Sequence, residues 1–368
     1  MRRWLGRWGV GLLVLAVVGC STAPPANSGP ASQGASSTAS PATFDFKGKT
    51  VHLVVGYSAG GGFDANARLL APELQAALPG NPTVVVDNQP GADSLLAAKT
   101  VLTQPQKTDE VDVVVYVSTL LAKSVLNGGL DGFAIEKQSV FVGMPDGWPE
   151  PLALCARKST VANLDTFLSR SEPLKVGGLT GSSYYDALLR WVKAAGFPVD
   201  IVFGYAATAP LILAFNQGEV DALPACRDQD LLQNPDWLNQ DQITPLFGLR
   251  GMPVALKQAQ AQGRYPWLKD VVDAKPMSDE LKATLKALND LNTGTNVYAV
   301  SQQTPTAAQQ ALQQAFQQAV QTADYKAQME KRQLEPGYRG PQDIAALLNQ
   351  INGFSADEKS QLSMLLGT

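Results

Sequence analysis

Short runs of β-branched and other apolar residues alternate with longer amphipathic stretches along most of this chain. The predicted strands cover residues 51–57, 83–88, 111–118, 139–144, 151–156, 174–178, 201–205 and 219–225. Helical patterns separate several of these strands, the clearest at residues 64–78, 183–196 and 209–218. Strands that are apolar along nearly their whole length, in alternation with helices, are typical of parallel sheets covered on both faces. We therefore expect an α/β fold with parallel sheets.

The length of the chain and the lack of a repeat limit the possible domain organisations. No period of twenty to fifty residues recurs, which argues against a solenoid or a propeller. The chain has 368 residues, enough for two lobes that each bury a core. We predict a first lobe made of residues 44–150 and 250–368 and a second lobe made of residues 151–249.

The N-terminus has the pattern of a bacterial lipoprotein signal. Arg2, Arg3 and Arg7 precede an apolar run from Val10 to Val18, and a glycine and Cys20 follow that run. The run is too short to span a bilayer, so we predict a signal peptide over residues 1–20 that is cleaved before Cys20. The cysteine thiol would then carry a lipid. A plain signal peptide followed by a chance cysteine is the alternative.

The segment after Cys20 differs in composition from the rest of the chain. Residues 21–43 are almost wholly small, polar or proline and carry no charge, so we expect a disordered tether between lipid and folded domain. No later apolar stretch is long enough to cross a membrane. The expected location is therefore extracytoplasmic, anchored to the bacterial cell membrane by lipid. The formal net charge is -4 and no basic block occurs, so we expect no nucleic-acid partner.

Cysteine usage fits the same compartment. The chain has three cysteines, and Cys20 is assigned to the lipid. Cys155 and Cys226 remain on the oxidising side of the membrane, where we predict a disulfide between them. Two buried free thiols or a metal site are the alternatives, although the chain's one histidine leaves few ligands for a metal. We expect neither a metal nor a cofactor.

The stretch VVGYSAGGGFD, residues 54–64, fits two kinds of site. It contains the G-x-S-x-G pattern in which Ser58 would be the nucleophile of a serine hydrolase. It also places Gly60, Gly61 and Gly62 just before a predicted helix, where backbone N–H groups and the helix dipole favour an anion. A tight strand-to-helix turn with no ligand is the third reading.

The hydrolase hypothesis lacks a general base. A serine nucleophile usually takes its base from a histidine later in the chain, whereas His52 precedes Ser58 on the same strand. The S-x-x-K motif of a serine–lysine pair is also missing. The spacing of the glycines matches neither G-x-G-x-x-G nor a P-loop. We therefore expect a binding protein rather than an enzyme, with Ser58 as a hydroxyl donor.

A second glycine-rich loop of the same kind follows the predicted strand at 174–178. It offers Gly178, Thr180, Gly181, Ser182 and Ser183 ahead of another predicted helix. Two such loops, one in each lobe, would suit a dicarboxylate or an amphoteric small acid. The alternative is that a serine here simply caps the helix.

Five other residues are candidates for the binding site. Ser118 and Thr119 are predicted to end the third strand, where α/β folds place ligands. Tyr57 and Tyr205 are candidates for an aromatic wall, with core packing as the alternative. Arg227 follows a predicted strand and is the candidate for a single charged contact.

Residues 48–98 resemble the N-terminal signature of the solute receptors of tripartite tricarboxylate transporters, also called the Bug family. That signature is a strand, a triple-glycine loop, an Asp, an Arg on the next helix, and a second strand ending in Asn-x-Pro-Gly-Ala. The matching positions here are Gly60 to Gly62, Asp64, Arg68, Asn88, Pro90, Gly91 and Ala92. Residues 204–222 resemble a later family segment, and the similarity runs from about Phe46 to Leu348.

The resemblance implies a two-lobed, type II periplasmic-binding fold with a cleft that closes on a small organic acid. It also implies delivery of that acid to the membrane permease subunits of a tripartite tricarboxylate transporter, by a receptor that we expect to be a monomer. Family members hold carboxylates through backbone N–H groups, hydroxyls and water. Asp64 occupies the Asp position of the family signature and is a candidate site residue, although it can instead pair with Arg68 on its own helix. A binding lipoprotein that serves a signalling partner is the alternative function.

Two positions depart from the family pattern. The family usually has a proline before the glycines, where this chain has Ser58 and Ala59, and a Lys-Gly after the later tyrosine, where this chain has Ala206 and Ala207. The resemblance therefore does not identify the acid.

Overall fold

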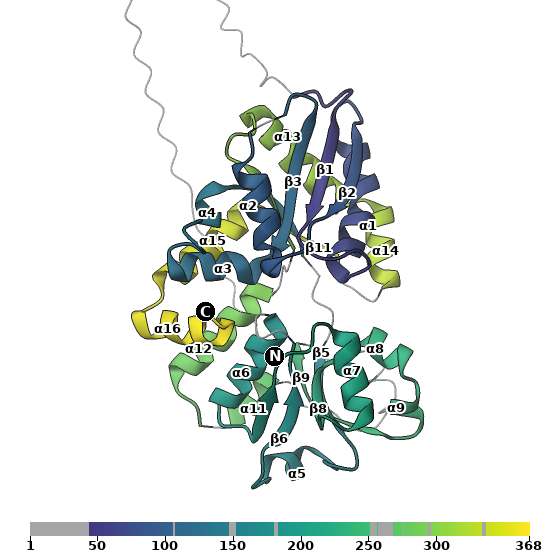
Figure 1. Cartoon of the computed structure of the whole chain (residues 1–368), viewed down its shortest axis with the longest axis vertical. Helices are drawn as coiled ribbons and strands as arrows, with labels where there is room; N and C mark the ends of the chain where they lie inside the picture. The colour runs from purple at the N-terminus through teal and green to yellow at the C-terminus, as the bar shows by residue number, and fades with distance from the viewer. Residues whose placement is uncertain are drawn as a thin grey trace, which may run out of the picture. The chain divides into compact units, whose positions relative to one another are not determined.

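Two β-sheets with helices on their faces make up the computed structural model (Figure 1). The structure describes residues 44–105, 107–146, 152–179, 183–250, 256, 268–274, 276–292, 296–332 and 336–368. The predicted signal peptide, the predicted tether and Cys20, the predicted site of lipidation, lie outside the described residues. Among the helices in these ranges, none combines the length and apolar character needed to cross a membrane.

The first sheet has six strands in the order β11-β4-β10-β3-β1-β2. These strands are β1 (Thr50–Val55), β2 (Thr83–Asn88), β3 (Glu110–Val117), β4 (Ser139–Asp146), β10 (Asn296–Ser301) and β11 (Gly337–Arg339). Strands β2 and β3 pair with β1 in parallel, whereas β10 is antiparallel to both β3 and β4. The chain thus returns to this sheet after it has formed the second one.

The second sheet has five strands in the order β7-β6-β8-β5-β9. These strands are β5 (Leu152–Arg157), β6 (Leu174–Gly177), β7 (Val199–Val202), β8 (Ala222–Cys226) and β9 (Ile243–Arg250). Strand β6 is parallel to β7 and β8, and β5 is antiparallel to β8 and β9.

The prediction of parallel sheets is wrong in part, because both sheets are mixed. An apolar strand that is buried on both faces looks the same in sequence whichever way its neighbours run, so strand direction had no signal in the pattern. Strand β9 was also missed. It lies at the edge of its sheet and contains Pro245, a residue that sheets tolerate mainly at edges and that hides a strand pattern.

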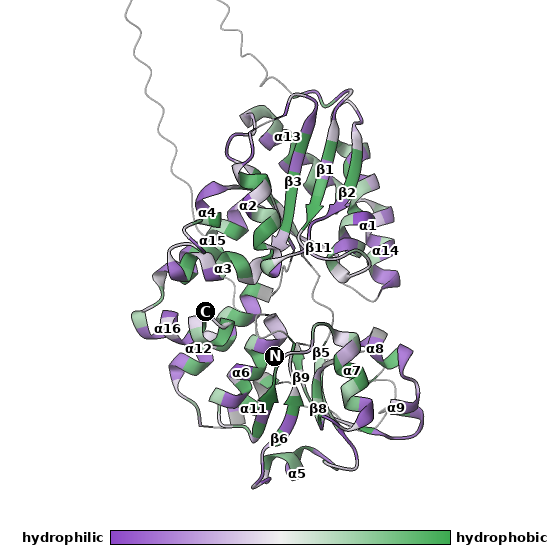
Figure 2. Cartoon of the chain, in the orientation of Figure 1, coloured by the Kyte–Doolittle hydropathy of each residue, from purple (hydrophilic) through white to green (hydrophobic). Residues whose placement is uncertain are grey.

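Helices cover both faces of the first sheet. Alternate residues of β3 point to opposite faces, and each set packs in its own apolar cluster. Val113 and Val115 pack in one cluster with α1 (Gly62–Ala77), α13 (Thr306–Ala319) and α14 (Ala323–Lys331). Val114 and Tyr116 pack in another. That second cluster includes residues of α2 (Leu95–Thr103), α3 (Ser118–Asn127) and α4 (Ile135–Gln138). Figure 2 shows apolar residues gathered in the strands and mixed character on the helices.

The second sheet is also covered on both faces. One cluster joins β6 to residues of α5 (Leu164–Leu168), α6 (Tyr184–Ala194), α11 (Leu268–Ala274), α12 (Asp279–Asn292), α15 (Pro341–Gly353) and α16 (Ala356–Leu366). The other joins β8 to residues of α7 (Thr208–Gln217), α8 (Asp228–Gln233) and α9 (Asp236–Asn239). Helices beyond residue 250 thus complete the second core, while β10 and α13 belong to the first. The predicted lobe boundaries remain a prediction.

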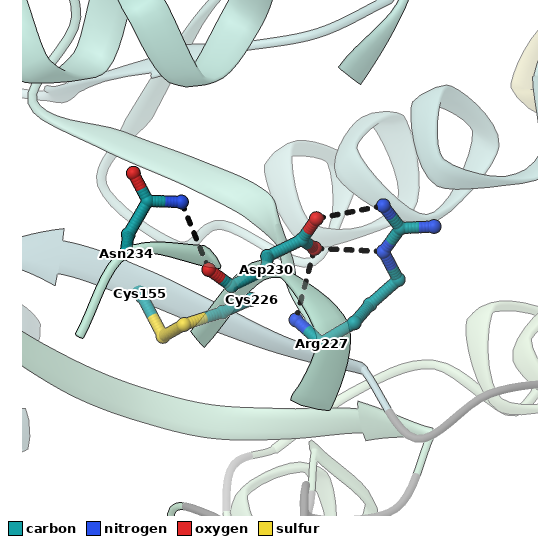
Figure 3. The surroundings of a disulfide bond; sticks show 5 residues. All are labelled: Cys155, Cys226, Arg227, Asp230 and Asn234. Carbon is teal, nitrogen blue, oxygen red and sulfur yellow. Dashed lines mark hydrogen bonds and ion pairs between the residues drawn. A yellow bond between two sulfur atoms is a disulfide. The ribbon is translucent and has the colours of Figure 1, made fainter. Parts of the chain in front are cut away.

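A disulfide joins Cys155 of β5 to Cys226 of β8 (Figure 3). The two strands are antiparallel neighbours, and the Cα atoms of the cysteines are 6.0 Å apart. The predicted pairing is confirmed, and both side chains are fully buried. Because the bridge closes a sequence separation of 71 residues, loop-closure entropy gives it about 4 kcal/mol of stabilisation.

Candidate ligand-binding site

The first glycine loop exposes its backbone between β1 and α1. Residues 58–62 are all exposed, and Gly60 has a φ of +82°. Gly61 is the N-cap residue of α1, and as a glycine it has no side chain that could accept a hydrogen bond from the first turn. The first N–H groups of any α-helix have no partner within the helix, so this loop presents donors that a small anion can approach.

Asp64 already occupies part of this anion site. It is the third residue of α1, and its Oδ2 accepts hydrogen bonds from the Gly60 N–H at 2.9 Å and from Arg68 Nε at 3.0 Å. Arg68 holds the pKa of the Asp64 carboxyl below its ordinary value, and the Gly60 N–H adds to the effect. The alternative, that Asp64 pairs with Arg68 on its own helix, is confirmed. Asp64 is therefore an anion that shapes the loop and uses the Gly60 N–H itself, so a carboxylate ligand would have to use the other backbone donors of the loop.

The residues that carry the family resemblance form one network around this loop. Arg68 also donates to Asn88 Oδ1 at 3.2 Å, and Asn88 Nδ2 donates to the Tyr57 carbonyl at 2.9 Å. The end of β2 is thereby tied to the loop that follows β1. Sequence positions 57, 64, 68 and 88 are thus brought together.

The second glycine loop is built in the same way. Ser183 caps α6: its hydroxyl accepts from the Asp186 N–H at 3.2 Å and donates to Asp186 Oδ2 at 2.7 Å. Asp186 also accepts from the Leu179 N–H at 2.6 Å. The alternative reading of Ser183 as a helix cap is therefore confirmed, and its hydroxyl is engaged within the protein. Thr180, Gly181 and Ser182 lie outside the described residues, while Gly178 directly precedes Leu179.

Ser118 and Thr119 do not end the third strand, as the sequence suggested, but begin α3. Strand β3 ends at Val117, one residue earlier than predicted. Ser118 Oγ donates to the Leu291 carbonyl at 2.6 Å, which ties α3 to α12. Thr119 is 1 % exposed, and its Oγ1 has no hydrogen-bond partner within the described part of the chain. Thr119 is thus the one of the two with an unused hydroxyl.

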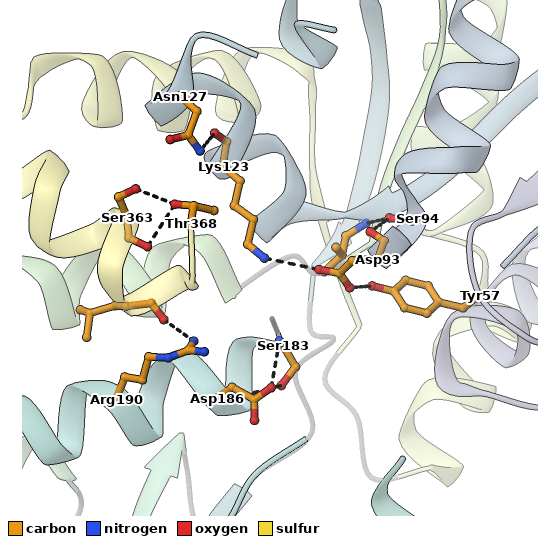
Figure 4. Close-up of polar contacts among 12 residues, drawn as sticks. Tyr57, Asp93, Ser94, Lys123, Asn127, Ser183, Asp186, Arg190, Ser363 and Thr368 are labelled. Carbon is orange, nitrogen blue, oxygen red and sulfur yellow. Dashed lines mark hydrogen bonds and ion pairs between the residues drawn. The ribbon is translucent and has the colours of Figure 1, made fainter. Parts of the chain in front are cut away.

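A buried charged network lies beside these residues and was not predicted (Figure 4). Tyr57 donates from its hydroxyl to Asp93 Oδ1 at 2.6 Å, and Lys123 Nζ of α3 lies 3.6 Å from Asp93 Oδ2. Lys123 is only 6 % exposed. Burial lowers the pKa of Lys123, and Asp93 opposes that shift. Burial, and then Asp93, raise the pKa of Tyr57 well above its usual value, so the phenol remains a donor.

The loop that carries Asp93 is conformationally strained. The φ angles of Ala92, Asp93 and Ser94 are 46°, 53° and 72°, and Gly91 has a φ of 150°. Left-handed backbone costs of order 1 kcal/mol or more for a residue other than glycine, and such strain concentrates at functional sites. Ser94 also packs tightly against Gly56. A Cβ added to Gly56 would lie only 2.2 Å from the Ser94 Cβ.

One weak sign of this network is present in the sequence. Lys123 interrupts the apolar run LLAKSVL, and a lone lysine there could equally have faced solvent. Asp93 follows the Pro-Gly-Ala turn and had no distinguishing spacing. The contact depends on how the loop after β2 folds over the start of α3, which local periodicity does not encode.

Arg227 and Tyr205 lie on the second sheet's side of the molecule. Arg227 donates to both oxygens of Asp230, from Nε at 2.7 Å and from one terminal nitrogen at 2.8 Å (Figure 3). Its charge is therefore balanced within α8 and the residue before it, which weakens its case as a ligand contact. Tyr205 packs against the apolar cluster beside β8, and burial, helped by Glu219, raises its pKa.

The described contacts also bear on the hydrolase hypothesis. His52 Nδ1 lies 2.6 Å from Asp87 Oδ2, on the neighbouring strand β2. Its backbone pairs within the sheet while Ser58 lies beyond the strand end. His52 therefore does not contact Ser58 and is not placed to serve as its general base.

A surface pocket of about 780 Å³ lies elsewhere, over the helices beside β8. Its walls include Arg157, Phe215, Asn216 and Trp237, and it contains none of the predicted site residues. Arg157 is itself stacked over the Phe215 ring at 4.9 Å and donates to the Val220 carbonyl at 3.1 Å. We therefore centre the candidate site on the loops after β1 and β2 and the start of α3.

Comparison with known proteins identifies the fold. A scan against protein-family models gives no match, and a search of curated protein sequences gives none either. Among solved structures, a TctC solute-binding protein from Polaromonas is 18 % identical with a TM-score of 0.54, over 83 % of this chain and 99 % of that one. MatC from Rhodopseudomonas palustris, solved with malate, is 18 % identical with a TM-score of 0.56, over 86 % and 99 % of the two chains.

A third solved structure agrees with these two. The R. palustris protein Rpa4515, solved with adipate, is 18 % identical with a TM-score of 0.58, over 88 % of this chain and 99 % of that one. Identity at this level is informative about the fold, and the matches span nearly the whole of the solved chains. The chain has the two-lobed α/β fold of TctC and Bug periplasmic solute-binding proteins.

Proposed function

We propose that this protein is an extracytoplasmic receptor that captures a small organic acid and delivers it to a membrane transporter of the tripartite tricarboxylate type. The observation that carries the proposal is the exposed glycine backbone before α1, in a loop whose Tyr57 is linked through Asp93 to the buried Lys123 in the middle of α3. Backbone donors and a cation together suit a carboxylate. The similar structures named with malate and adipate have this fold.

Several features support a receptor rather than an enzyme. In the described parts of the glycine loops, the Ser183 hydroxyl caps α6, and the chain's one histidine, His52, contacts Asp87 rather than Ser58. The disulfide fits an oxidising compartment. The lipoprotein signal, with Cys20 as its lipidated residue, would keep the receptor at its membrane. We propose that it acts as a monomer and needs no cofactor.

A ligand screen with one backbone variant tests the proposal. Unlipidated protein carrying Cys20→Ser is titrated with mono-, di- and tricarboxylates and amino acids, and melting temperature is followed as a function of ligand concentration. A true ligand raises it progressively, since it binds the folded state. Gly61→Val should reduce this response, because Gly61 has ordinary extended φ and a side chain there would only obstruct the loop. A full response in Gly61→Val would show that acids bind elsewhere.

A further inference from the structure

Four polar side chains gather on one face of the first sheet, on three neighbouring strands. His52 of β1 lies directly opposite Asp112 of β3 in the parallel register, and Glu110 lies two residues before Asp112 on the same face. Asp87 belongs to β2, on the other side of β1. Ligand-type atoms of His52, Glu110 and Asp112 all lie within 4.8 Å of one another. These three residues, called the histidine cluster below, are thus one imidazole and two carboxylates drawn from adjacent strands.

Asp87 fixes which nitrogen of His52 faces the two carboxylates. His52 Nδ1 lies 2.6 Å from Asp87 Oδ2, and an ionised carboxylate only accepts hydrogen bonds, so Nδ1 is the donor. Nε2 is buried, has no hydrogen-bond partner within the described part of the chain, and lies 3.9 Å from Glu110 Oε2. A neutral imidazole would leave two acceptors face to face there. A proton on Nε2 or a metal ion resolves this conflict, and a histidine held by a carboxylate at its other nitrogen is the usual arrangement of a metal ligand.

A cation already lies against the two carboxylates. Lys107 Nζ is 2.5 Å from Glu110 Oε2 and 3.5 Å from Asp112 Oδ2. The lysine side chain is 49 % exposed, so its ammonium can turn into water at little cost. A metal ion bound by the histidine cluster would therefore displace Lys107 rather than add to it.

The histidine cluster is accessible from solvent. Its three side chains are between 18 % and 39 % exposed, so an ion can reach them without any opening of the fold. Bonds of 2.0–2.2 Å to a tetrahedral zinc ion place ligand atoms about 3.4 Å apart. Small rotations of Glu110 and Asp112 suffice to reach that spacing from separations of up to 4.8 Å.

We propose that His52 Nε2, Glu110 and Asp112 bind a divalent transition-metal ion of the zinc type, with Asp87 as the positioning residue and water completing the coordination shell. One imidazole nitrogen and two carboxylate oxygens suit Zn²⁺, whereas Mg²⁺ and Ca²⁺ prefer oxygen ligands alone. The ion would clamp β1 to β3. The sequence-based expectation of no metal rested on the single histidine, and the two carboxylates on the neighbouring strand supply the ligands that a count of histidines overlooks.

The metal site goes beyond the proposed function and lies apart from the solute site. His52 is three residues before the end of β1 at Val55, a span of about 10 Å along the strand. The exposed glycine loop begins only beyond that end. Metal binding and acid binding can therefore be measured separately, and the failure of either proposal leaves the other in place.

The test is calorimetric titration of untagged, unlipidated Cys20→Ser protein with Zn²⁺, in the absence of organic acids. One zinc ion should bind per chain, and equal concentrations of Mg²⁺ or Ca²⁺ should not displace it. NMR gives a second measurement, because the chain has one histidine and every imidazole signal comes from His52. The Nε2 signal should shift on addition of zinc, while Nδ1 keeps its proton.

Variants assign the ligands. His52→Gln should abolish zinc binding, and Asp112→Asn should weaken it strongly, which keeps the test decisive if His52→Gln does not fold. Asp87→Asn should weaken binding by about 10-fold to 100-fold, the range for a residue that orients a ligand. Lys107→Met should instead tighten binding by about twofold to fivefold, since an exposed ion pair no longer competes with the metal.

Asp200→Asn is the matched control. Asp200 is an exposed carboxylate on β7 of the other sheet and pairs with Lys193 at 3.1 Å, so its loss should leave zinc binding unchanged. An absence of zinc binding by the starting protein, an imidazole signal that zinc does not move, or unchanged affinity in both His52→Gln and Asp112→Asn would each overturn the proposal. Weaker binding by Lys107→Met would also overturn it, because the ammonium would then support the bound ion rather than compete with it.

Discussion

Asp64 and Asp186 hold equivalent positions in the two halves of the molecule: each is the third residue of a helix and accepts an N–H from the glycine loop before it. Asp64 bonds the Gly60 N–H at 2.9 Å, and Asp186 bonds the Leu179 N–H at 2.6 Å. Each helix N-terminus thus carries a built-in anion that fixes its loop and offsets the dipole. A solute carboxylate must therefore use donors other than the Gly60 and Leu179 N–H groups, such as those of α3.

Loss of the Asp186 carboxylate should destabilise the protein. It is fully buried and completes a capping box with Ser183, so Asp186→Ala is expected to lower the free energy of unfolding by about 1–3 kcal/mol. Urea unfolding measures the change. Asp165→Ala is the control, since Asp165 lies in the first turn of α5 but is exposed. Equal small effects of both substitutions would contradict the structural role of Asp186.

Acid titration should reveal the contact between Asp64 and Arg68. Arg68 lowers the pKa of Asp64 in the folded chain. The resulting stabilisation is present above the ordinary pKa of 3.8 and is lost as the pH falls through the lower, folded value. The difference in unfolding free energy between wild type and Arg68→Met should therefore shrink on acidification below 3.8. A difference that stays constant or grows would rule out this linkage.

The close approach of Gly56 to Ser94 predicts a sharp contrast between two glycines. Gly56→Ala should strongly destabilise the fold or displace the loop after β2, because the new Cβ would lie 2.2 Å from the Ser94 Cβ and 2.7 Å from its Cα. Gly61→Ala should be tolerated, since its Cβ would meet only the Ser58 carbonyl oxygen at 3.4 Å. Thermal melts of the two variants decide the point. Similar melting temperatures would mean that the packing at Gly56 is wrong.

Removal of the disulfide should cost stability without changing the fold. Cys155→Ala/Cys226→Ala frees a loop spanning 71 residues in the unfolded chain, for which loop-closure entropy predicts a loss of about 4 kcal/mol. Denaturant unfolding and circular dichroism provide the measurement. The wild-type protein treated with a reductant under native conditions is the companion sample, and it should retain the bridge because both cysteines are fully buried. Unchanged stability in the double variant would contradict this expectation.

Much of the fold followed from local patterns, and most of the site did not. The strands around residues 51–55 and 111–117 and the helices after the glycine loops were predicted because apolar periodicity and capping are local signals. Strand direction was not predictable, since a buried strand is apolar whichever way its neighbours run. The link between Asp93 and Lys123 depends on a strained loop folding over a helix start, and no spacing in the sequence encodes that contact. Arg227 looked like a ligand contact only because its partner Asp230 was not recognised.

Calorimetric titration of the wild-type and Lys123→Met proteins with a panel of small organic acids tests the central claim most directly. We predict that at least one carboxylate binds the wild-type protein with a defined affinity and stoichiometry, and that Lys123→Met weakens this binding by about tenfold or more. An acid that binds both proteins equally would contradict the place of Lys123 in the site, and a wild-type protein that binds no acid would contradict the proposed function.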